Sequence, residues 1–306
     1  MIPKSGYRFS EKIMLKQYPG GSLVEACLAA VVATLLSGCL LAASVGAETP
    51  PRRVASFNLC ADQLVVALAD PDQIAGLSPY AADPVLSVVA DEARAFRRLG
   101  WQAEAAITLA PDLVLVGPND RSTTRRMLTA QGMRVEDVEL VTDFPAAVAQ
   151  IRRFADLLGH PARGERLVAA LAAARARLRN APRPPVATAL VVERGGYTQG
   201  PQSLAASLIA EAGLRPPDGS PHGYGGFLAL ERLLMLKPDV VFLKDPPAEA
   251  TDQGALFFTH PALQALYPPE RRIALPTRFT MCGGPALVAA VDYLAAVMTR
   301  LAKGRY

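Results

Sequence analysis

EAAITLAPDLVLV at residues 104–116 and ERLLMLKPDVVFL at residues 231–243 are two versions of one segment. Aligned without gaps, they share the first Glu, a Leu five residues later, a Pro-Asp pair and a Val two residues beyond it. A proline disfavours helix at the residue before it, and the apolar run that follows is typical of a strand covered on both faces. Each copy therefore predicts a short helix that begins with an acid, followed by a buried strand. The copies lie 127 residues apart (231 − 104), too far for a solenoid repeat, so they indicate two similar lobes.

The composition is that of a folded protein. A chain of 306 residues with 51% hydrophobic residues is long enough to bury one large core or two moderate ones. A charged fraction of 20% argues against extended disorder. The formal charge of +4 is modest and the basic residues are scattered, so nucleic acid is not an expected partner.

The N-terminal residues 1–47 predict an export signal, because basic residues precede an uncharged apolar run at 26–45. A small-x-small pattern at 45–47 gives a mature start near Glu48. The alternative is a lipobox at 36–39, which would place a lipid anchor on Cys39. Because apolar residues continue past Cys39, we favour the soluble form. A retained membrane anchor of about 20 residues is the third reading, and Met14 is an alternative start.

After Arg53, predicted strands and helices alternate, which indicates α/β structure with parallel sheets. A long helical stretch at 144–181, with a kink or break at Gly159-His160-Pro161, interrupts the alternation, which resumes at Val186. We therefore predict two Rossmann-like lobes, 53–143 and 186–303, each with a parallel sheet and joined by one long α-helix. The alternative is a single doubly wound sheet with a long crossover helix.

Ligands of parallel α/β lobes bind beyond the carboxyl ends of the strands, so the loops that follow the predicted strands are the candidate site. These loops carry aromatic residues, an arginine and two cysteines from both halves, as a large, partly apolar ligand with anionic groups requires. The predicted ligand-binding residues are Asn58, Cys60, Tyr80, Trp101, Tyr197, Tyr224, Arg278 and Cys282. The sequence leaves three roles open for the cysteines: a disulfide, a thiolate contact to a metal in the ligand, or two small residues.

Catalytic and metal-binding signals are weak. The chain has no GxSxG, HExxH, GxxxxGK[ST] or CxxC motif, and its glycines at 195, 196 and 200 do not have the GxGxxG spacing. Its three histidines are far apart in sequence, so we predict no catalytic residue, no protein-bound metal and no cofactor. His222, in a candidate loop, is more consistent with an ordinary loop histidine than with an axial ligand of a chelated metal.

Glu104 and Glu231 occupy matching positions in the two copies. A single glutamate in the first turn of a helix is commonplace, since it gains about 0.3–1 kcal/mol from the helix dipole. Two at matching positions indicate a pair of negative contacts, one per lobe, able to dock on the basic sockets of a two-fold partner.

With its export signal, two lobes, linking helix and repeated E…L-x-PD segments, the chain resembles the periplasmic binding proteins for cobalamin and iron–siderophore complexes, the class with a helical hinge. The resemblance covers the region from Arg53 to Leu301. It implies that Glu104 and Glu231 pair with arginines of a dimeric membrane permease and that Trp101 lines the ligand cleft. It also implies a stiff hinge with limited closure.

The predicted function is therefore a non-enzymatic, exported component of an ABC importer. It would bind a metal chelate (ferric siderophore, haem or cobalamin) and deliver it to a permease and its ATPase, reaching the membrane only through them or through a lipid on Cys39. Two rivals remain. An exported two-domain enzyme of the chelatase or glycosyltransferase type would need titratable groups that converge in the cleft. A ligand-sensing module for a signalling receptor would not need paired docking sockets.

Overall fold

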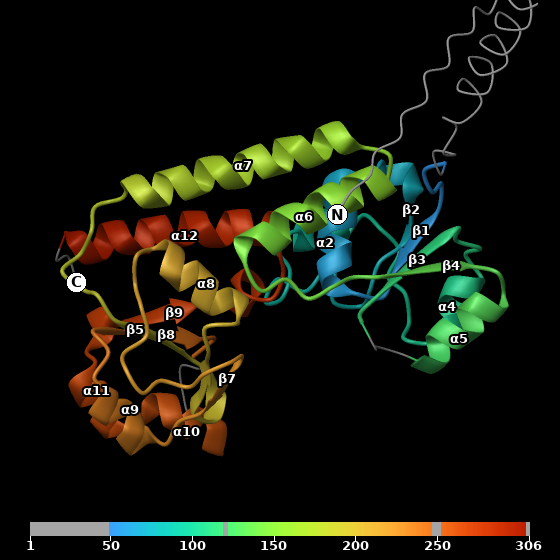
Figure 1. The fold of residues 1–306 in the computed structure, drawn as a ribbon. Coiled ribbons are helices and arrows are strands. Elements are labelled where there is room, and N and C mark those ends of the chain that lie inside the picture. The colour runs from blue at the N-terminus through green and yellow to red at the C-terminus, as the bar shows by residue number, and fades with distance from the viewer. Residues whose placement is uncertain (1–48, 119–121, 247–251, 304–306) are drawn as a thin grey trace, which may run out of the picture. The chain divides into compact units, whose positions relative to one another are not determined.

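The computed structural model describes residues 49–118, 122–246 and 252–303, so the predicted export signal and Cys39 lie outside the described residues. From Pro50 onward the chain forms one compact unit. It contains two α/β lobes that are bridged by long helices (Figure 1). This confirms the predicted fold class.

The first lobe contains a fully parallel sheet. Its strands follow the order β2 (Ile74–Gly76), β1 (Val54–Ser56), β3 (Leu113–Val116) and β4 (Arg134–Asp137). Alternate residues of β3 enter two different cores, as expected for a strand covered on both faces: Leu113 and Leu115 on one side, Val114 and Val116 on the other. The helices of this lobe are α2 (Leu59–Leu68), α3 (Ala90–Ala93), α4 (Ala103–Ile107) and α5 (Ser122–Ala130).

The second lobe differs from the prediction, because its sheet is mixed. The order is β7 (Gly225–Phe227), β6 (Tyr197–Gln199), β5 (Ala189–Val192), β8 (Val240–Lys244) and β9 (Arg272–Leu275). β6 runs antiparallel to both of its neighbours, whereas β5, β8 and β9 are parallel. The stretches around Tyr197 and Gly225 were expected to be loops, since three residues with adjacent glycines carry almost no strand signal. The helices here are α8 (Leu204–Glu211), α9 (Leu230–Leu236), α10 (Gln253–Thr259) and α11 (Pro261–Leu266).

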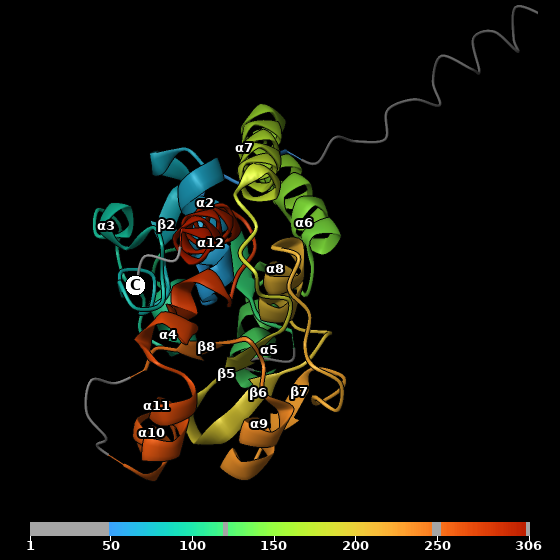
Figure 2. The same cartoon turned by 90° about the vertical axis from the view of Figure 1, so that its left-hand side faces the viewer.

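The linking stretch 144–181 forms two helices, α6 (Phe144–Leu157) and α7 (Pro161–Asn180), with the break at the predicted Gly159-His160-Pro161. α7 packs on α2 and α6 of the first lobe and on α8 of the second, and it runs beside the last helix, α12 (Pro285–Ala302). Figures 1 and 2 show α7 and α12 side by side across both lobes. One hydrophobic core runs from Val54 of the first sheet through these helices to Phe242 of the second.

The C-terminal segment also contacts the first lobe, although the sequence assigned it to the second. After β9 the chain crosses back, and Cys282 and Ala286 pack with Leu59 of α2. Gly284, with φ of 63°, lies so close to α2 that a Cβ added there would be 2.8 Å from Leu64 Cδ2. By length and composition α12 could span a membrane, but eight of its residues are buried in the fold.

The repeated Pro-Asp pairs have the same structural role in both lobes. Asp112 accepts hydrogen bonds from the backbone N–H groups of Arg52 (2.7 Å) and Arg53 (3.0 Å), immediately before β1. Asp239 accepts from Ala187 and Thr188, both at 2.8 Å, immediately before β5. In each copy the residue before the proline has φ of 45° and ends the helical turn. The repeat therefore aligns a strand with its central neighbour in each lobe.

Candidate functional site

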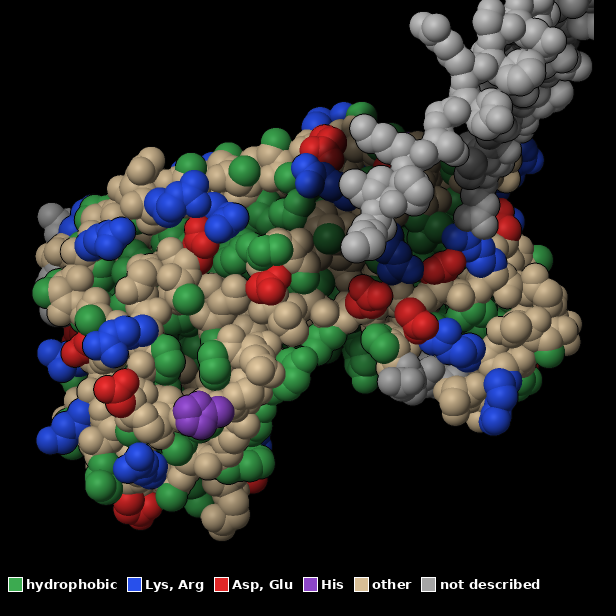
Figure 3. Space-filling view, viewed as in Figure 1, with side chains coloured by type: hydrophobic (Ala, Val, Ile, Leu, Met, Phe, Trp, Pro, Cys, Tyr) green, Lys and Arg blue, Asp and Glu red, His purple; other side chains and the backbone are tan. Residues whose placement is uncertain are grey.

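The carboxyl ends of the parallel strands, where ligands of such sheets bind, are joined by the segment that crosses back between the lobes. In this segment, residues 276–284, Arg278 Nη1 donates a 2.9 Å hydrogen bond to the carbonyl of Pro84 in the first lobe. A disulfide joins Cys282 to Cys60, with their Cα atoms 5.1 Å apart. Figure 3 shows the hollow that separates the two lobes below the linking helices.

The first lobe presents an aromatic pair. The rings of Tyr80 and Trp101 have centroids 5.0 Å apart and planes at 57°, a favourable tilted contact. Tyr80 lies in the loop after β2, and Trp101 lies just before α4. Tyr80 is 48% exposed, so part of its ring is available for a ligand.

The second lobe presents an aromatic cluster on β6, β7 and the turn before β7. Tyr197 and Phe227 form an edge-to-face pair with centroids 5.4 Å apart, and the Tyr197 hydroxyl donates to the carbonyl of Tyr224 at 3.4 Å. Phe227 is 77% exposed, the most exposed large apolar residue among those described. Sequence reasoning missed Phe227 because it missed β7, and its only signal was an apolar residue beside the predicted Gly-rich loop.

Tyr224 also lines a pocket to which both lobes contribute. This pocket has a volume of about 540 Å³, and Thr142 and Asp143 line it from the N-terminal side of α6. On the other side it is lined by the loop 201–202, by α8 and by Tyr224. The structure thus places one predicted aromatic residue where both lobes meet the same cavity.

Asn58, Cys60 and Cys282 come together at a small pocket of about 90 Å³ at the crossing segment. The Asn58 side chain caps α2, accepting from the backbone N–H of Cys60 (2.9 Å) and of Ala61 (3.0 Å). The disulfide settles the three-way choice left open for the cysteines, since neither sulfur is a free thiolate. Cys282 is also buried, and its contact with a ligand stays a prediction.

Charged groups at the carboxyl ends of β5 and β8 are paired with one another. Lys244 Nζ lies 2.8 Å from Glu193 Oε1, and both side chains are largely buried. Glu193 also accepts a hydrogen bond from Gln199 Nε2. Sequence reasoning did not single out Glu193, although its place directly after a buried strand was a usable signal. This pair therefore places balanced charges at the carboxyl ends of β5 and β8.

Glu104 and Glu231 are exposed in the first turns of α4 and α9. Neither forms an ion pair with any residue that the structure describes. Each helix leads directly into a parallel strand and so runs antiparallel to it, which places its first turn toward the carboxyl edge of the sheet. The two glutamates therefore project from the lobes at the same edge as the aromatic residues.

The described ranges hold no group of three or more His, Cys, Asp or Glu side chains arranged to bind a metal ion. His160 hydrogen-bonds to Gln73 (2.8 Å), His260 caps α11, and His222 is exposed.

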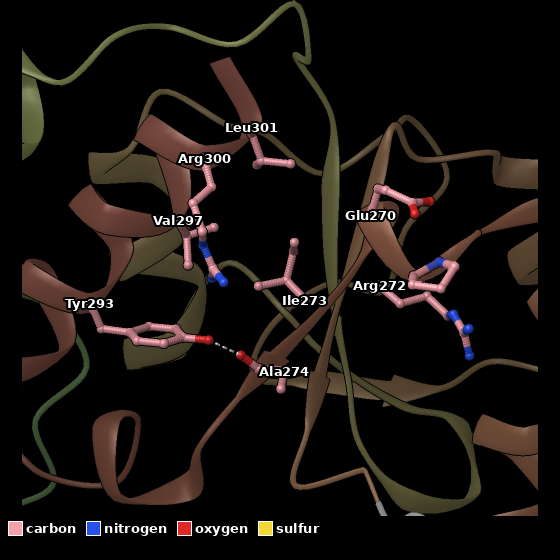
Figure 4. A pocket seen from close by; sticks show the side chains of 9 residues that line it. Glu270, Arg272, Ile273, Ala274, Tyr293, Val297, Arg300 and Leu301 are labelled. Carbon is pink, nitrogen blue, oxygen red and sulfur yellow. Dashed lines mark hydrogen bonds between the residues drawn. The ribbon is translucent and has the colours of Figure 1, made fainter. Parts of the chain in front are cut away.

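A separate pocket of about 320 Å³ lies between β9 and α12 (Figure 4). Arg300 extends into it, and the Tyr293 hydroxyl donates to the carbonyl of Ala274. Burial raises the pKa of Tyr293, so that hydroxyl stays protonated. None of the predicted site residues lines this pocket.

The family model described as periplasmic binding protein matches residues 54–266. No curated protein matches the sequence. The fold is similar to that of periplasmic heme-binding protein RhuT from Roseiflexus sp. RS-1, with 23% identity, a TM-score of 0.64 and coverage of 82% of this chain and 99% of that one. A periplasmic heme-binding protein from Pseudomonas aeruginosa is similar with 21% identity and a TM-score of 0.63, over 82% of this chain and 94% of that one. The periplasmic vitamin B12 binding protein BtuF of Vibrio cholerae is similar with 15% identity and a TM-score of 0.62, over 84% of this chain and 99% of that one.

Proposed function

The chain belongs to the periplasmic binding protein family, and from this premise we propose that it is the solute-binding component of an ABC importer for a metal chelate. The chelate would be haem, a cobalamin or a ferric siderophore, bound between the lobes in the periplasm. Structural neighbours named for heme and vitamin B12 binding support this ligand class. The protein would bind its ligand without catalysis, since the family consists of binding proteins.

The observation that carries the proposal is the presence of aromatic surface on both lobes. Tyr80 and Trp101 supply it on the first lobe, and Tyr197, Tyr224 and Phe227 supply it on the second. Broad, rigid aromatic faces suit a large chelate with an apolar periphery, because they bury much area at little cost in side-chain entropy. The ion pair of Glu193 and Lys244 adds hydrogen-bonding capacity without net charge.

The linking helices support a mode of binding with little closure. A single hydrophobic core continues through α7 and α12 from one sheet to the other, and a disulfide and the Arg278–Pro84 hydrogen bond tie the crossing segment to the first lobe. Bending the molecule there would disturb close-packed side chains. We infer that the site is largely pre-formed before the ligand enters.

Trp101 is the only tryptophan, so its fluorescence reports directly on the proposed site. The purified protein lacking residues 1–47 is titrated separately with hemin, cyanocobalamin and a ferric hydroxamate siderophore. We expect saturable quenching by one of these probes with 1:1 stoichiometry, checked by calorimetry. If none of the three binds saturably, the proposed ligand class is wrong.

A further inference from the structure

Asp62 of α2 is a fully buried carboxylate in the first lobe. It accepts hydrogen bonds from the backbone N–H of Ser78 (3.1 Å) and from the Ser78 hydroxyl (2.5 Å). The Ser56 hydroxyl donates to the carbonyl of Asn58 (3.0 Å), and it also lowers the pKa of Asp62. Ser56 ends β1 and Ser78 follows β2, so Asp62 interacts with the carboxyl ends of two strands and hydrogen-bonds to Ser78.

Both serines also form hydrogen bonds with residues of the candidate site. The Ser78 hydroxyl oxygen accepts a 3.2 Å hydrogen bond from the backbone N–H of Tyr80, whose ring contacts Trp101. The Ser56 hydroxyl oxygen accepts from the backbone N–H of Asn58 at 3.2 Å, and Asn58 caps α2 beside the disulfide. Asp62 therefore holds the loop after β2 through Ser78.

We propose that Asp62 is a positioning residue of the ligand site, which sets the geometry of the Tyr80–Trp101 pair through Ser78 and makes that geometry change in mildly acidic conditions. This inference rests on the proposed function for its biological meaning. Its physical content, the coupling of Asp62 to the aromatic pair, stands without any ligand.

The protonation state of Asp62 decides which hydrogen bonds exist. The carboxylate only accepts, which satisfies the N–H and O–H of Ser78 together. When Asp62 is protonated, its new O–H donates to the Ser78 oxygen, which leaves the Ser78 proton without its acceptor. The Ser78 hydroxyl then has to reorient, and it is this oxygen that holds the backbone of Tyr80.

The protonation of Asp62 falls within a pH range in which the protein can be studied. Burial raises the pKa of Asp62 to about 6, and the hydrogen bonds from Ser56 and Ser78 only partly oppose it. Among described residues, no charged side chain of α2, β1, β2 or any neighbouring element contributes to this pKa. Histidine is the side-chain type that ordinarily changes charge in this range, and His160 contacts the first lobe through Gln73.

The test follows Trp101 fluorescence and near-UV circular dichroism of the ligand-free protein from pH 4.5 to 8. We expect one transition with a midpoint near 6 in the wild type, lost in Asp62→Asn. His160→Gln is the matched control and should retain it, because His160 bonds to Gln73 at the opposite end of β2. A transition that survives in Asp62→Asn, or is absent in the wild type, overturns the proposal.

Ser78→Ala provides a second test if Asp62→Asn does not fold. It keeps the backbone hydrogen bond to Asp62 but removes the hydroxyl that links Asp62 to Tyr80. We expect a folded protein whose Trp101 fluorescence shows no transition near pH 6. An unchanged transition would contradict the proposed coupling of Asp62 to Tyr80 through the Ser78 hydroxyl. Because no ligand is present, this outcome is independent of whether hemin, cyanocobalamin or the siderophore binds.

Discussion

At the scale of the residue, the most informative side chains are the two aspartates of the repeated Pro-Asp pairs. Each accepts backbone N–H groups at the start of a central strand, and Asp239 also accepts from the Thr188 hydroxyl at 2.9 Å. The repeat was first informative as evidence of two lobes. The structure shows why Pro-Asp recurs: the proline follows the left-handed residue that ends the helical turn, and the aspartate fixes the register of the sheet.

We expect Asp239→Ala to lower the free energy of unfolding by about 2–4 kcal/mol, since hydrogen bonds to a charged group contribute about 1.5–3 kcal/mol. Asp112→Ala should cost less, because Asp112 is more exposed and has one donor fewer. Asp72→Ala, at an exposed position, is the control and should change stability by no more than about 0.5 kcal/mol. Urea unfolding measures all three.

The Asp239 contribution also has a defined pH dependence. The hydrogen bonds from the backbone of Ala187 and Thr188 lower the pKa of Asp239 below its usual value of 3.8. Its stabilisation is therefore fully present above about pH 4 and is lost as the pH falls through the lowered pKa. If the free energies of unfolding of the wild type and Asp239→Ala differ by the same amount at pH 7 and well below pH 3, the ionised carboxylate of Asp239 is not the stabilising group.

At the scale of the element, the sequence predicted most helices and strands that have a strong periodic or apolar signal. Val240–Lys244 is an example, because an unbroken apolar run flanked by Pro-Asp leaves little choice. β6 and β7 could not be predicted, because these three-residue strands beside glycines are stabilised by sheet pairing, β6 with β5 and β7 with β6, rather than by local preference. The disulfide could not be predicted either, because no local sequence pattern shows that two cysteines 222 residues apart lie close together in the fold.

The candidate site was predicted in part for the same reason. The loop of Tyr80 was found because it follows a visible strand, whereas Trp101 was noted because it precedes the first copy of the repeat. Their rings contact each other, and their contact with a ligand stays a prediction. Arg278 and Asn58 were predicted as ligand contacts from their loops, but each side chain has a partner within the fold. Their contact with a ligand stays a prediction.

The first turns of α4 and α9 carry the predicted docking contacts. We expect Glu104→Arg combined with Glu231→Arg to abolish uptake through the proposed permease, because the two introduced arginines would repel the permease arginines that the glutamates are predicted to contact. The affinity for the ligand should stay within about twofold, since both glutamates are exposed and neither forms a hydrogen bond or ion pair with a candidate site residue in the described part of the chain. Cellular uptake and calorimetry measure the two effects.

Glu92→Arg is the matched control for this pair, because Glu92 is also exposed in the first turn of a short helix, α3. Uptake should be normal in this variant. Normal uptake by the Glu104→Arg, Glu231→Arg protein would show that docking uses another surface.

At the scale of the whole molecule, the two lobes share one hydrophobic core and one covalent crosslink, while their aromatic surfaces come from different sheets. This arrangement favours a ligand that bridges two prepared surfaces over one that is enclosed by a large domain movement. We therefore propose that a chelate binds to both lobes at once.

The most direct test removes one aromatic ring from each lobe. Tyr80→Ala and Phe227→Ala are titrated with whichever of hemin, cyanocobalamin and ferric hydroxamate binds the wild type most tightly. Leu266→Ala, an exposed apolar residue of α11, serves as the control. We predict that each aromatic variant weakens binding about tenfold or more, the effect of removing a buried aromatic contact of about 1.4 kcal/mol, while the control binds normally. Unchanged affinity in either aromatic variant would contradict a ligand held between the two lobes.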